Sequence, residues 1–109
     1  MSITKIIIYT TQSGKAPFKE WLEELDAKTR AIVRTRIDRV RLGNFGDCKV
    51  LTDGEGLSEL RISFGAGYRV YFGRDGRALI ILLTGGDKSS QKRDISKAKE
   101  YWRAYKELK

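Results

Sequence analysis

The side chains that could do chemistry in this chain are carboxylates, phenols and cations, because the sequence contains no histidine. Histidine is the usual proton carrier near neutral pH, so acid–base chemistry here must use a carboxylate, a lysine, a tyrosine or the substrate itself. The acids show no calcium-loop spacing, and a lone cysteine, Cys48, cannot build a thiolate metal site. The sequence therefore predicts neither a metal site nor a cofactor.

The most promising group of such side chains follows two short stretches, 60–64 and 68–72, in which apolar and polar residues alternate. Alternation of this kind is typical of strands, and the intervening residues 65–67 have turn chemistry. A turn of three residues places Arg61 opposite Tyr71 and Ser63 opposite Arg69. One face of this predicted hairpin then carries the polar set Glu59, Arg61, Ser63, Arg69 and Tyr71.

This polar face has two interpretations. Planar guanidinium groups bind phosphate oxygens with two hydrogen bonds each, so Arg61 and Arg69 beside the phenol of Tyr71 and the carboxylate of Glu59 could hold a phosphate. The alternative is an ordinary solvated sheet face with polar pairs between the strands. The pattern of residues is compatible with both.

Three further cations, Lys88, Lys92 and Arg93, follow an apolar stretch at 78–84 and open a predicted C-terminal helix. Positive charge at the start of a helix opposes the helix dipole. A bound polyanion would offset that cost, so these cations could extend a phosphate-binding surface. Long side chains that point into water explain them equally well.

The elements that must position these groups form one domain over residues 1–109, of the size expected for a single core. Residues 3–10 predict a strand, and Pro17 opens a helix whose apolar stripe is Phe18, Trp21, Leu22 and Leu25. Asp26 can cap a second helix that ends at Gly43. Three strands and a last helix follow, with a further short strand expected near 48–51. The order βααβββα predicts an α+β fold in which a helical hairpin covers a mostly antiparallel sheet.

The charge of the whole chain points to an anionic partner. The chain has 22 basic and 14 acidic residues, a formal net charge of +8. Such a charge favours nucleic acid or an acidic protein. The longest apolar stretch, 78–83, is too short to span a bilayer, and the N-terminus lacks the features of a signal peptide. We therefore expect a cytoplasmic protein without a membrane partner.

Residues 56–102 resemble a known toxin family, most specifically in the segments LSELRI, GYRVYF and LLTGGDKSSQKRDI. The segments PFKEWLEEL and LGNFGD extend the resemblance over nearly the whole chain. The family is the phage-derived addiction module killer protein branch (Gp49-like or HigB) of the RelE/HigB/ParE toxin superfamily. The resemblance implies the RelE/ParE-like fold and a toxin of a type II toxin–antitoxin pair. It also implies two partners, a small helix-turn-helix antitoxin and the ribosome with its mRNA.

Many toxins of this superfamily cut mRNA on the ribosome without a metal, with the ribose 2′-OH as the nucleophile. In that reading Arg69 matches the arginine that contacts the scissile phosphate, Arg61 a basic position on the preceding strand, and Lys88 the basic residue after the last strand. RelE has further lysines near the position of Glu59 and a C-terminal tyrosine used in proton transfer, whereas this chain has Lys92, Arg93 and Asp94 there. Tyr71 or Glu59 could take over that role.

The ParE branch shares the fold but inhibits DNA gyrase without cutting RNA. Fold alone does not separate the two activities. ParE-like toxins lack a complete basic set, whereas this chain has both strand arginines. We therefore expect an mRNA endonuclease, an enzyme that blocks translation, with gyrase inhibition as the alternative.

Overall fold

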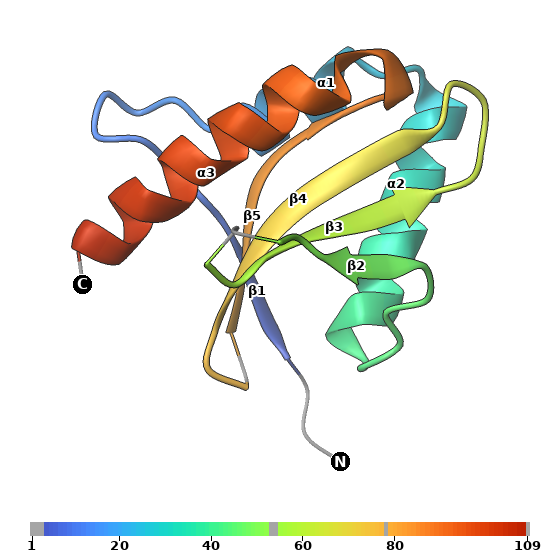
Figure 1. The fold of residues 1–109 in the computed structure, drawn as a ribbon. Coiled ribbons are helices and arrows are strands. Elements are labelled where there is room, and N and C mark those ends of the chain that lie inside the picture. Colours follow the sequence, from blue (N-terminus) through green and yellow to red (C-terminus); the bar gives the residue numbers. More distant parts are fainter. Residues whose placement is uncertain (1–3, 53–54, 78, 109) are drawn as a thin grey trace.

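Five strands form one mixed sheet in the computed structural model, which describes residues 4–52, 55–77 and 79–108 (Figure 1). The sheet order is β1-β5-β4-β3-β2, with β1 parallel to β5 and the other pairs antiparallel. The predicted α+β class with a mostly antiparallel sheet is confirmed, and the short strand expected near 48–51 is present. The elements in chain order are β1 Lys5–Ile8, α1 Pro17–Glu24, α2 Ala27–Arg41, β2 Cys48–Val50, β3 Leu57–Ile62, β4 Tyr68–Asp75, β5 Leu79–Gly86, the 3-10 turn η1 Lys88–Ser90 and α3 Gln91–Glu107.

The helical hairpin α1–α2 covers one face of the sheet, as predicted. Pro17 stands at the start of α1, and Phe18 and Leu22 are buried against the strands. The side chain of Asp26 accepts a hydrogen bond from the backbone N–H of Thr29, so Asp26 caps α2. The apolar stripe of α2 enters the same core through Val33, Ile37 and Val40.

The opposite face of the sheet lies under α3, which crosses the strands in Figure 1. Trp102 of α3 packs flat on β4 at Gly73, where an added Cβ would lie 2.4 Å from the indole ring. On the other face Gly85 of β5 accommodates Trp21, which would be 2.3 Å from an added Cβ. Glycines inside strands usually mark such close approaches. The solvated sheet face considered from sequence is therefore largely covered by a helix.

The strand register differs from the predicted one by two residues. Arg61 pairs with Arg69, and Glu59 pairs with Tyr71, because β3 ends at Ile62 and the connection to β4 has five residues instead of three. Gly65 and Gly67 both have positive φ angles, 54° and 76°, which allow this wider turn. A shift of two residues keeps every side chain on its predicted face but changes its cross-strand neighbour.

The end of β5 also extends further than expected. Gly85 and Gly86 do not end the strand but pair with Val70 and Arg69 of β4. An added Cβ on Gly86 would overlap the carboxylate of Asp94 on α3. Asp87 follows β5 and caps η1 by accepting a hydrogen bond from the backbone N–H of Ser89 at 2.8 Å. The absence of a side chain at Gly86 therefore lets the first turn of α3 pack directly on the end of β5.

One arginine of α2 is structural. Arg36 lies away from the apolar stripe of α2, and its guanidinium donates to the carbonyl oxygens of Phe45 at 3.1 Å and Arg61 at 2.9 Å. Gly46, with a φ of 60°, leaves only 2.9 Å between an added Cβ and that guanidinium. Arg36 therefore ties α2 and the loop before β2 to the end of β3.

Among the described residues no helix has the length and hydropathy needed to cross a membrane.

Candidate functional site

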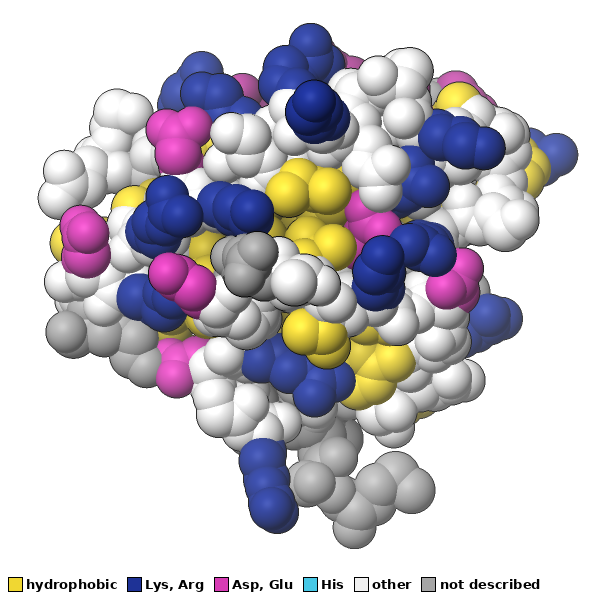
Figure 2. Space-filling model, viewed as in Figure 1, with side chains coloured by type: hydrophobic (Ala, Val, Ile, Leu, Met, Phe, Trp, Pro, Cys, Tyr) yellow, Lys and Arg dark blue, Asp and Glu magenta, His cyan; other side chains and the backbone are white. Residues whose placement is uncertain are grey.

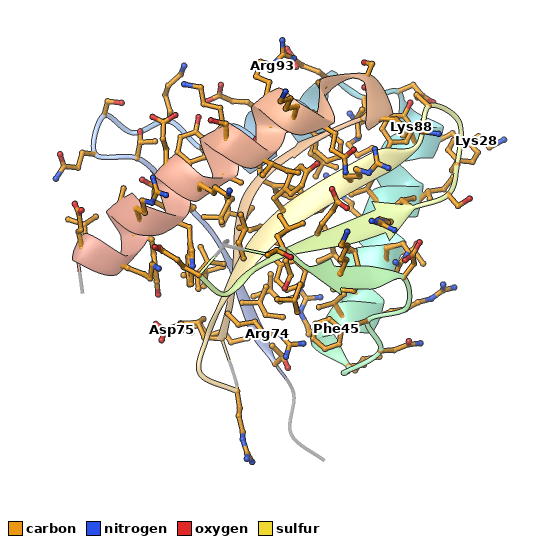
Figure 3. The ribbon with its side chains drawn as sticks, viewed as in Figure 1. Lys28, Phe45, Arg74, Asp75, Lys88 and Arg93 are labelled. Atoms are coloured by element: carbon orange, nitrogen blue, oxygen red, sulfur yellow. The ribbon has the colours of Figure 1, made fainter. Side chains whose placement is uncertain are left out.

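Three of the predicted cations lie around one cleft at the end of the β3–β4 pair. Arg61 and Arg69 come from adjacent strands and are direct cross-strand partners. Lys88 begins η1 just after β5, and its backbone N–H donates to the carbonyl of Ala66 in the β3–β4 turn at 3.4 Å. Figure 3 shows Lys88 beside this turn. The residues that line the cleft are Arg61, Arg69 and Lys88 together with Asp47, Ile62, Ser63, Gly67 and Tyr68.

A buried carboxylate lies beneath the two arginines. Glu59 has no exposed surface, and its Oε1 accepts a hydrogen bond from Arg61 Nε at 3.0 Å. Its Oε2 lies 3.7 Å from Arg69 Nε and accepts a hydrogen bond from Gln91 of α3 at 2.8 Å. Glu59 therefore fixes the orientation of both guanidiniums and ties the site to the start of α3.

Glu59 is held in its charged form. Burial alone raises the pKa of a carboxyl group. Here hydrogen bonds from Gln91 and Arg61, together with the charge of Arg69, outweigh burial and lower the pKa of Glu59 below its ordinary value. A buried carboxylate with these partners is a weak proton acceptor.

Tyr71 lies next to Glu59 and is also fully buried. Burial and then the negative charge of Glu59 raise the pKa of the Tyr71 phenol well above its ordinary value. Its hydroxyl is buried and makes no hydrogen bond of ordinary geometry with the described residues. Neither Glu59 nor Tyr71 lines the cleft, so both residues lie behind the arginines and not on the cleft surface.

Arg69 carries hydrogen-bond donors without acceptors. Its side chain is 14% exposed, against 37% for Arg61. Nε and Nη1 of Arg69 are buried and have no hydrogen-bond partner among the described residues. Buried donors of a charged group are usually satisfied, and an unsatisfied one costs free energy. Since these two nitrogens are closed to solvent, a ligand in the cleft can meet only the remaining part of the Arg69 guanidinium.

The other two predicted cations lie outside this cleft. Lys92 and Arg93 are exposed on α3 and are not among the residues that line it. Figure 3 places Arg93 on the outer side of α3, away from Lys88. Arg93 does affect Asp87, because its positive charge contributes to a lowered pKa of that carboxyl after the hydrogen bonds from Ser89. The structure thus brings Arg61, Arg69 and Lys88 together and leaves Lys92 and Arg93 on a separate surface.

Basic side chains are prominent on this side of the molecule. Figure 2 shows several dark blue side chains over the strands to the right of α3. Over the described residues no group of three or more potential ligands is arranged to hold a metal ion.

Two residues at the site, Gln91 and Asp47, were not predicted from the sequence. Gln91 reaches Glu59 across 32 positions of the chain, and no local pattern signals such a contact. Asp47 belongs to a loop whose backbone is paired with β3: its carbonyl accepts from the N–H of Arg61 at 2.9 Å. Tyr68 lines the cleft only through its place in β4, since its side chain packs with Trp21 against the core below α1.

The structure is thus a small α+β domain with a cleft lined by two arginines and a lysine. The family model for the phage-derived protein Gp49-like (DUF891) matches residues 20–106, and the chain belongs to this family. An uncharacterized protein of Haemophilus influenzae is 48% identical over 83 residues, which cover 75% of this chain and 82% of the relative. The predicted membership in the Gp49-like phage-derived family is therefore confirmed.

Proposed function

We propose that this protein is the toxin of a type II toxin–antitoxin pair, a member of the RelE/HigB superfamily that cuts mRNA on the ribosome without a metal. The observation that carries this proposal is the cleft lined by Arg61, Arg69 and Lys88, in which the two arginines are direct cross-strand partners. Gp49-like proteins are often toxins of such pairs, which agrees with the proposal.

The proposed reaction needs little besides positive charge and positioning. The ribose 2′-oxygen forms a bond to the phosphorus while the bond from phosphorus to the 5′-oxygen breaks, which leaves a 2′,3′-cyclic phosphate and a 5′-hydroxyl. The proton of the 2′-OH is released, and the 5′-oxygen gains one. Arginines that hold the nonbridging oxygens stabilise the charge of the pentavalent transition state. This chemistry is compatible with a cleft that contains no histidine.

Each residue of the cleft has a distinct role in this proposal. Arg69 binds a nonbridging oxygen through the part of its guanidinium that lines the cleft, and Arg61, opposite it, binds the second. Lys88 is exposed at the rim, where its ammonium group can donate to the leaving 5′-oxygen. Lys92 and Arg93 contact RNA away from the reacting phosphate.

Glu59 and Tyr71 take a different role from the catalytic one expected from sequence. Both are fully buried below the arginines, and neither reaches the cleft. In our proposal Glu59 is a positioning residue that holds Arg61 and Arg69 in register. Tyr71 packs behind the arginines and carries no proton during the reaction.

The direct test is cleavage of a labelled mRNA by the purified protein on ribosomes programmed with that mRNA. We expect products that end in a 2′,3′-cyclic phosphate, and we expect Arg69→Ala to reduce the cleavage rate at least about 100-fold, as loss of one charge-stabilising donor does elsewhere. The matched control is Arg34→Ala, which removes an exposed arginine of α2 and should cleave at the wild-type rate. Full activity of a folded Arg69→Ala variant would contradict the proposal.

The proposal also includes a protein partner. We expect a small helix-turn-helix antitoxin, encoded beside this gene, that binds the toxin one to one and contributes acidic residues to the Arg61/Arg69 cleft or to the basic face of α2. Light scattering of the two mixed proteins tests this expectation.

The alternative function is inhibition of DNA gyrase. If transcripts stay intact on expression of the protein and DNA supercoiling stops instead, the protein belongs to the gyrase inhibitors.

A further inference from the structure

The proposed reaction needs a group that accepts the proton of the ribose 2′-OH. Glu59 and Tyr71 are buried and do not line the cleft. Asp47 is exposed and is the one carboxylate among the described residues that line it. The Asp47 carboxylate forms no ion pair within 4.0 Å with another described residue. An ionised carboxylate accepts hydrogen bonds and protons, so Asp47 offers the cleft a proton acceptor that no cation occupies.

Asp47 stands at one end of a row of side chains that crosses three strands. Its carbonyl accepts a hydrogen bond from the N–H of Arg61 at 2.9 Å, and Arg61 is the cross-strand partner of Arg69. Cys48, the next residue, packs into the core on the α1–α2 face, so alternation along the chain puts Asp47 on the opposite face, with the two arginines. Neighbouring strands are about 4.8 Å apart, so the row extends over about 10 Å.

The backbone and the charge of Asp47 both link it to this row. Arg36 Nη2 of α2 donates a second hydrogen bond to the Asp47 carbonyl at 3.4 Å. The pKa of the Arg61 guanidinium is raised, first by its hydrogen bond to Glu59 and to a smaller extent by the negative charge of Asp47. The place of Asp47 at the cleft is therefore set by α2 and β3 together.

Lys88 lies at the opposite end of the row. β5 pairs with β4 on the side away from β3, and Gly86 at the end of β5 is the partner of Arg69. Lys88 follows two residues later and runs beside Gly67, where an added Cβ would lie 3.6 Å from the Cβ of Lys88. Figure 3 shows Lys88 at this turn. The two guanidiniums therefore stand between a carboxylate on one side and an ammonium group on the other.

We propose that Asp47 is the general base of the cleft and takes the proton of the 2′-OH. This inference rests on the proposed nuclease function and adds its proton acceptor. The attacking and leaving oxygens of a phosphoryl transfer are roughly in line, so the base and the acid belong on opposite sides of the phosphate. The 2′-oxygen bonds to phosphorus as its proton passes to Asp47, and the bond to the 5′-oxygen breaks as that oxygen takes a proton from Lys88. Exchange with water then returns both residues to their starting forms.

The test measures single-turnover cleavage of labelled mRNA on programmed ribosomes with two leaving groups. One mRNA has the natural 5′-oxygen at the linkage that the wild-type protein cuts, and the other has a bridging 5′-sulfur there, which leaves without a proton. On the natural mRNA, Asp47→Asn and Lys88→Ala should each cleave about 100-fold more slowly than wild type. On the sulfur mRNA, Lys88→Ala should come within a few-fold of wild type, whereas Asp47→Asn should stay about 100-fold slower.

Three controls separate proton transfer from folding and affinity. Asp38→Asn removes an exposed carboxylate from α2, where Asp38 pairs with Arg41, and should cleave both mRNAs at the wild-type rate. Asp47→Glu keeps a carboxylate at the cleft and should cleave faster than Asp47→Asn, with the same ratio to wild type on both mRNAs. An uncleavable 2′-O-methyl RNA should bind Asp47→Asn at least as tightly as wild type, because a negative charge is removed and the loss is confined to the chemical step.

The outcomes distinguish this inference from the proposed nuclease. The role of Asp47 would be overturned, and the nuclease would stand, if a folded Asp47→Asn protein cut the natural mRNA as fast as Asp38→Asn. A sulfur leaving group that restores Asp47→Asn, or a loss of rate that weaker RNA binding accounts for, would have the same meaning. Asp47→Glu supplies the comparison between the two mRNAs if Asp47→Asn does not fold. No cleavage of either mRNA by the wild-type protein would remove the nuclease and the general base together.

Discussion

At the scale of single residues, the site depends on a carboxylate that no solvent reaches. Glu59 interacts with both Arg61 and Arg69, and each arginine also lines the cleft. Removal of one partner from a buried ion pair leaves the other charges uncompensated, which is strongly destabilising. Glu59 therefore contributes to the stability of the fold as well as to the position of the proposed phosphate-binding groups.

The variant Glu59→Gln tests the stabilising role through its dependence on pH. The pKa of Glu59 is lowered in the folded protein from an ordinary value near 4.5. A carboxylate of this kind stabilises the fold fully above its unfolded pKa and loses that effect as the pH falls through its folded pKa. We expect the variant to be about 3 kcal/mol less stable at pH 7 and expect the difference to shrink below pH 4.

Urea unfolding of both proteins at pH 7 and pH 3.5 measures this difference. Asp38→Asn is the control, because its carboxylate is exposed and its loss should change stability little at either pH. A gap between wild type and Glu59→Gln that stays constant with pH would contradict the role given to the Glu59 charge.

Tyr71→Phe tests whether the phenol takes part in the reaction. The hydroxyl is buried, its pKa is raised, and it makes no hydrogen bond of ordinary geometry. Its removal should change the free energy of unfolding by about 1 kcal/mol or less and should leave cleavage within a few-fold of wild type. A folded Tyr71→Phe protein that cleaves at a small fraction of the wild-type rate would show that Tyr71 acts in the reaction.

At the scale of elements, the sequence predicted the faces of the strands but not their partners. Alternation along 60–64 and 68–72 correctly put Arg61, Arg69 and Glu59 on one side of the sheet. The register was wrong by two residues because two glycines can close turns of several lengths, and a shift of two changes no face. Contacts between distant elements, such as Gln91 with Glu59, depend on where α3 crosses the sheet. No local pattern carries that information.

The crossing of α3 over β4 depends on a glycine, which gives a prediction for the element. Gly73→Ala places a methyl group 2.4 Å from the Trp102 ring. Overpacking of a well-filled core costs about 1–3 kcal/mol, so the midpoint of urea unfolding should fall accordingly. The shift of α3 should also weaken the contact between Gln91 and Glu59.

The same Gly73→Ala substitution in a Trp102→Phe protein tests whether the clash with Trp102 causes the loss of stability. In Trp102→Phe the smaller ring relieves the clash, so Gly73→Ala should cost less there than in the wild-type protein. An equal cost in both backgrounds would mean that Trp102 does not set the space at Gly73.

At the scale of the whole molecule, charge and topology have different roles. The net charge of +8 favours attraction of polyanions from a distance, whereas in the proposed function the cross-strand pair of arginines, with Lys88, selects the place where one phosphate is held. The composition predicted the first property without any structure. The second required the connection from β5 to η1, which brings Lys88 beside the β3–β4 turn.

The salt dependence of RNA binding separates these two contributions. Three cations that each contact a phosphate of a single strand should give a slope of log affinity against log salt of about −2. Lys88→Ala should reduce the magnitude of that slope by about 0.7, whereas Arg34→Ala, outside the cleft, should leave it unchanged. Equal slopes for wild type and Lys88→Ala would remove Lys88 from the binding site.

The central claim is that the cleft of Arg61, Arg69 and Lys88 cuts mRNA during translation. Mapping of transcript 5′ ends after brief expression in cells, with and without a block of translation initiation, tests it most directly. The account predicts new ends inside coding regions of wild-type cells that disappear in Arg69→Ala and when initiation is blocked. Intact transcripts in growth-arrested wild-type cells, or the same ends in a folded Arg69→Ala variant, would contradict it.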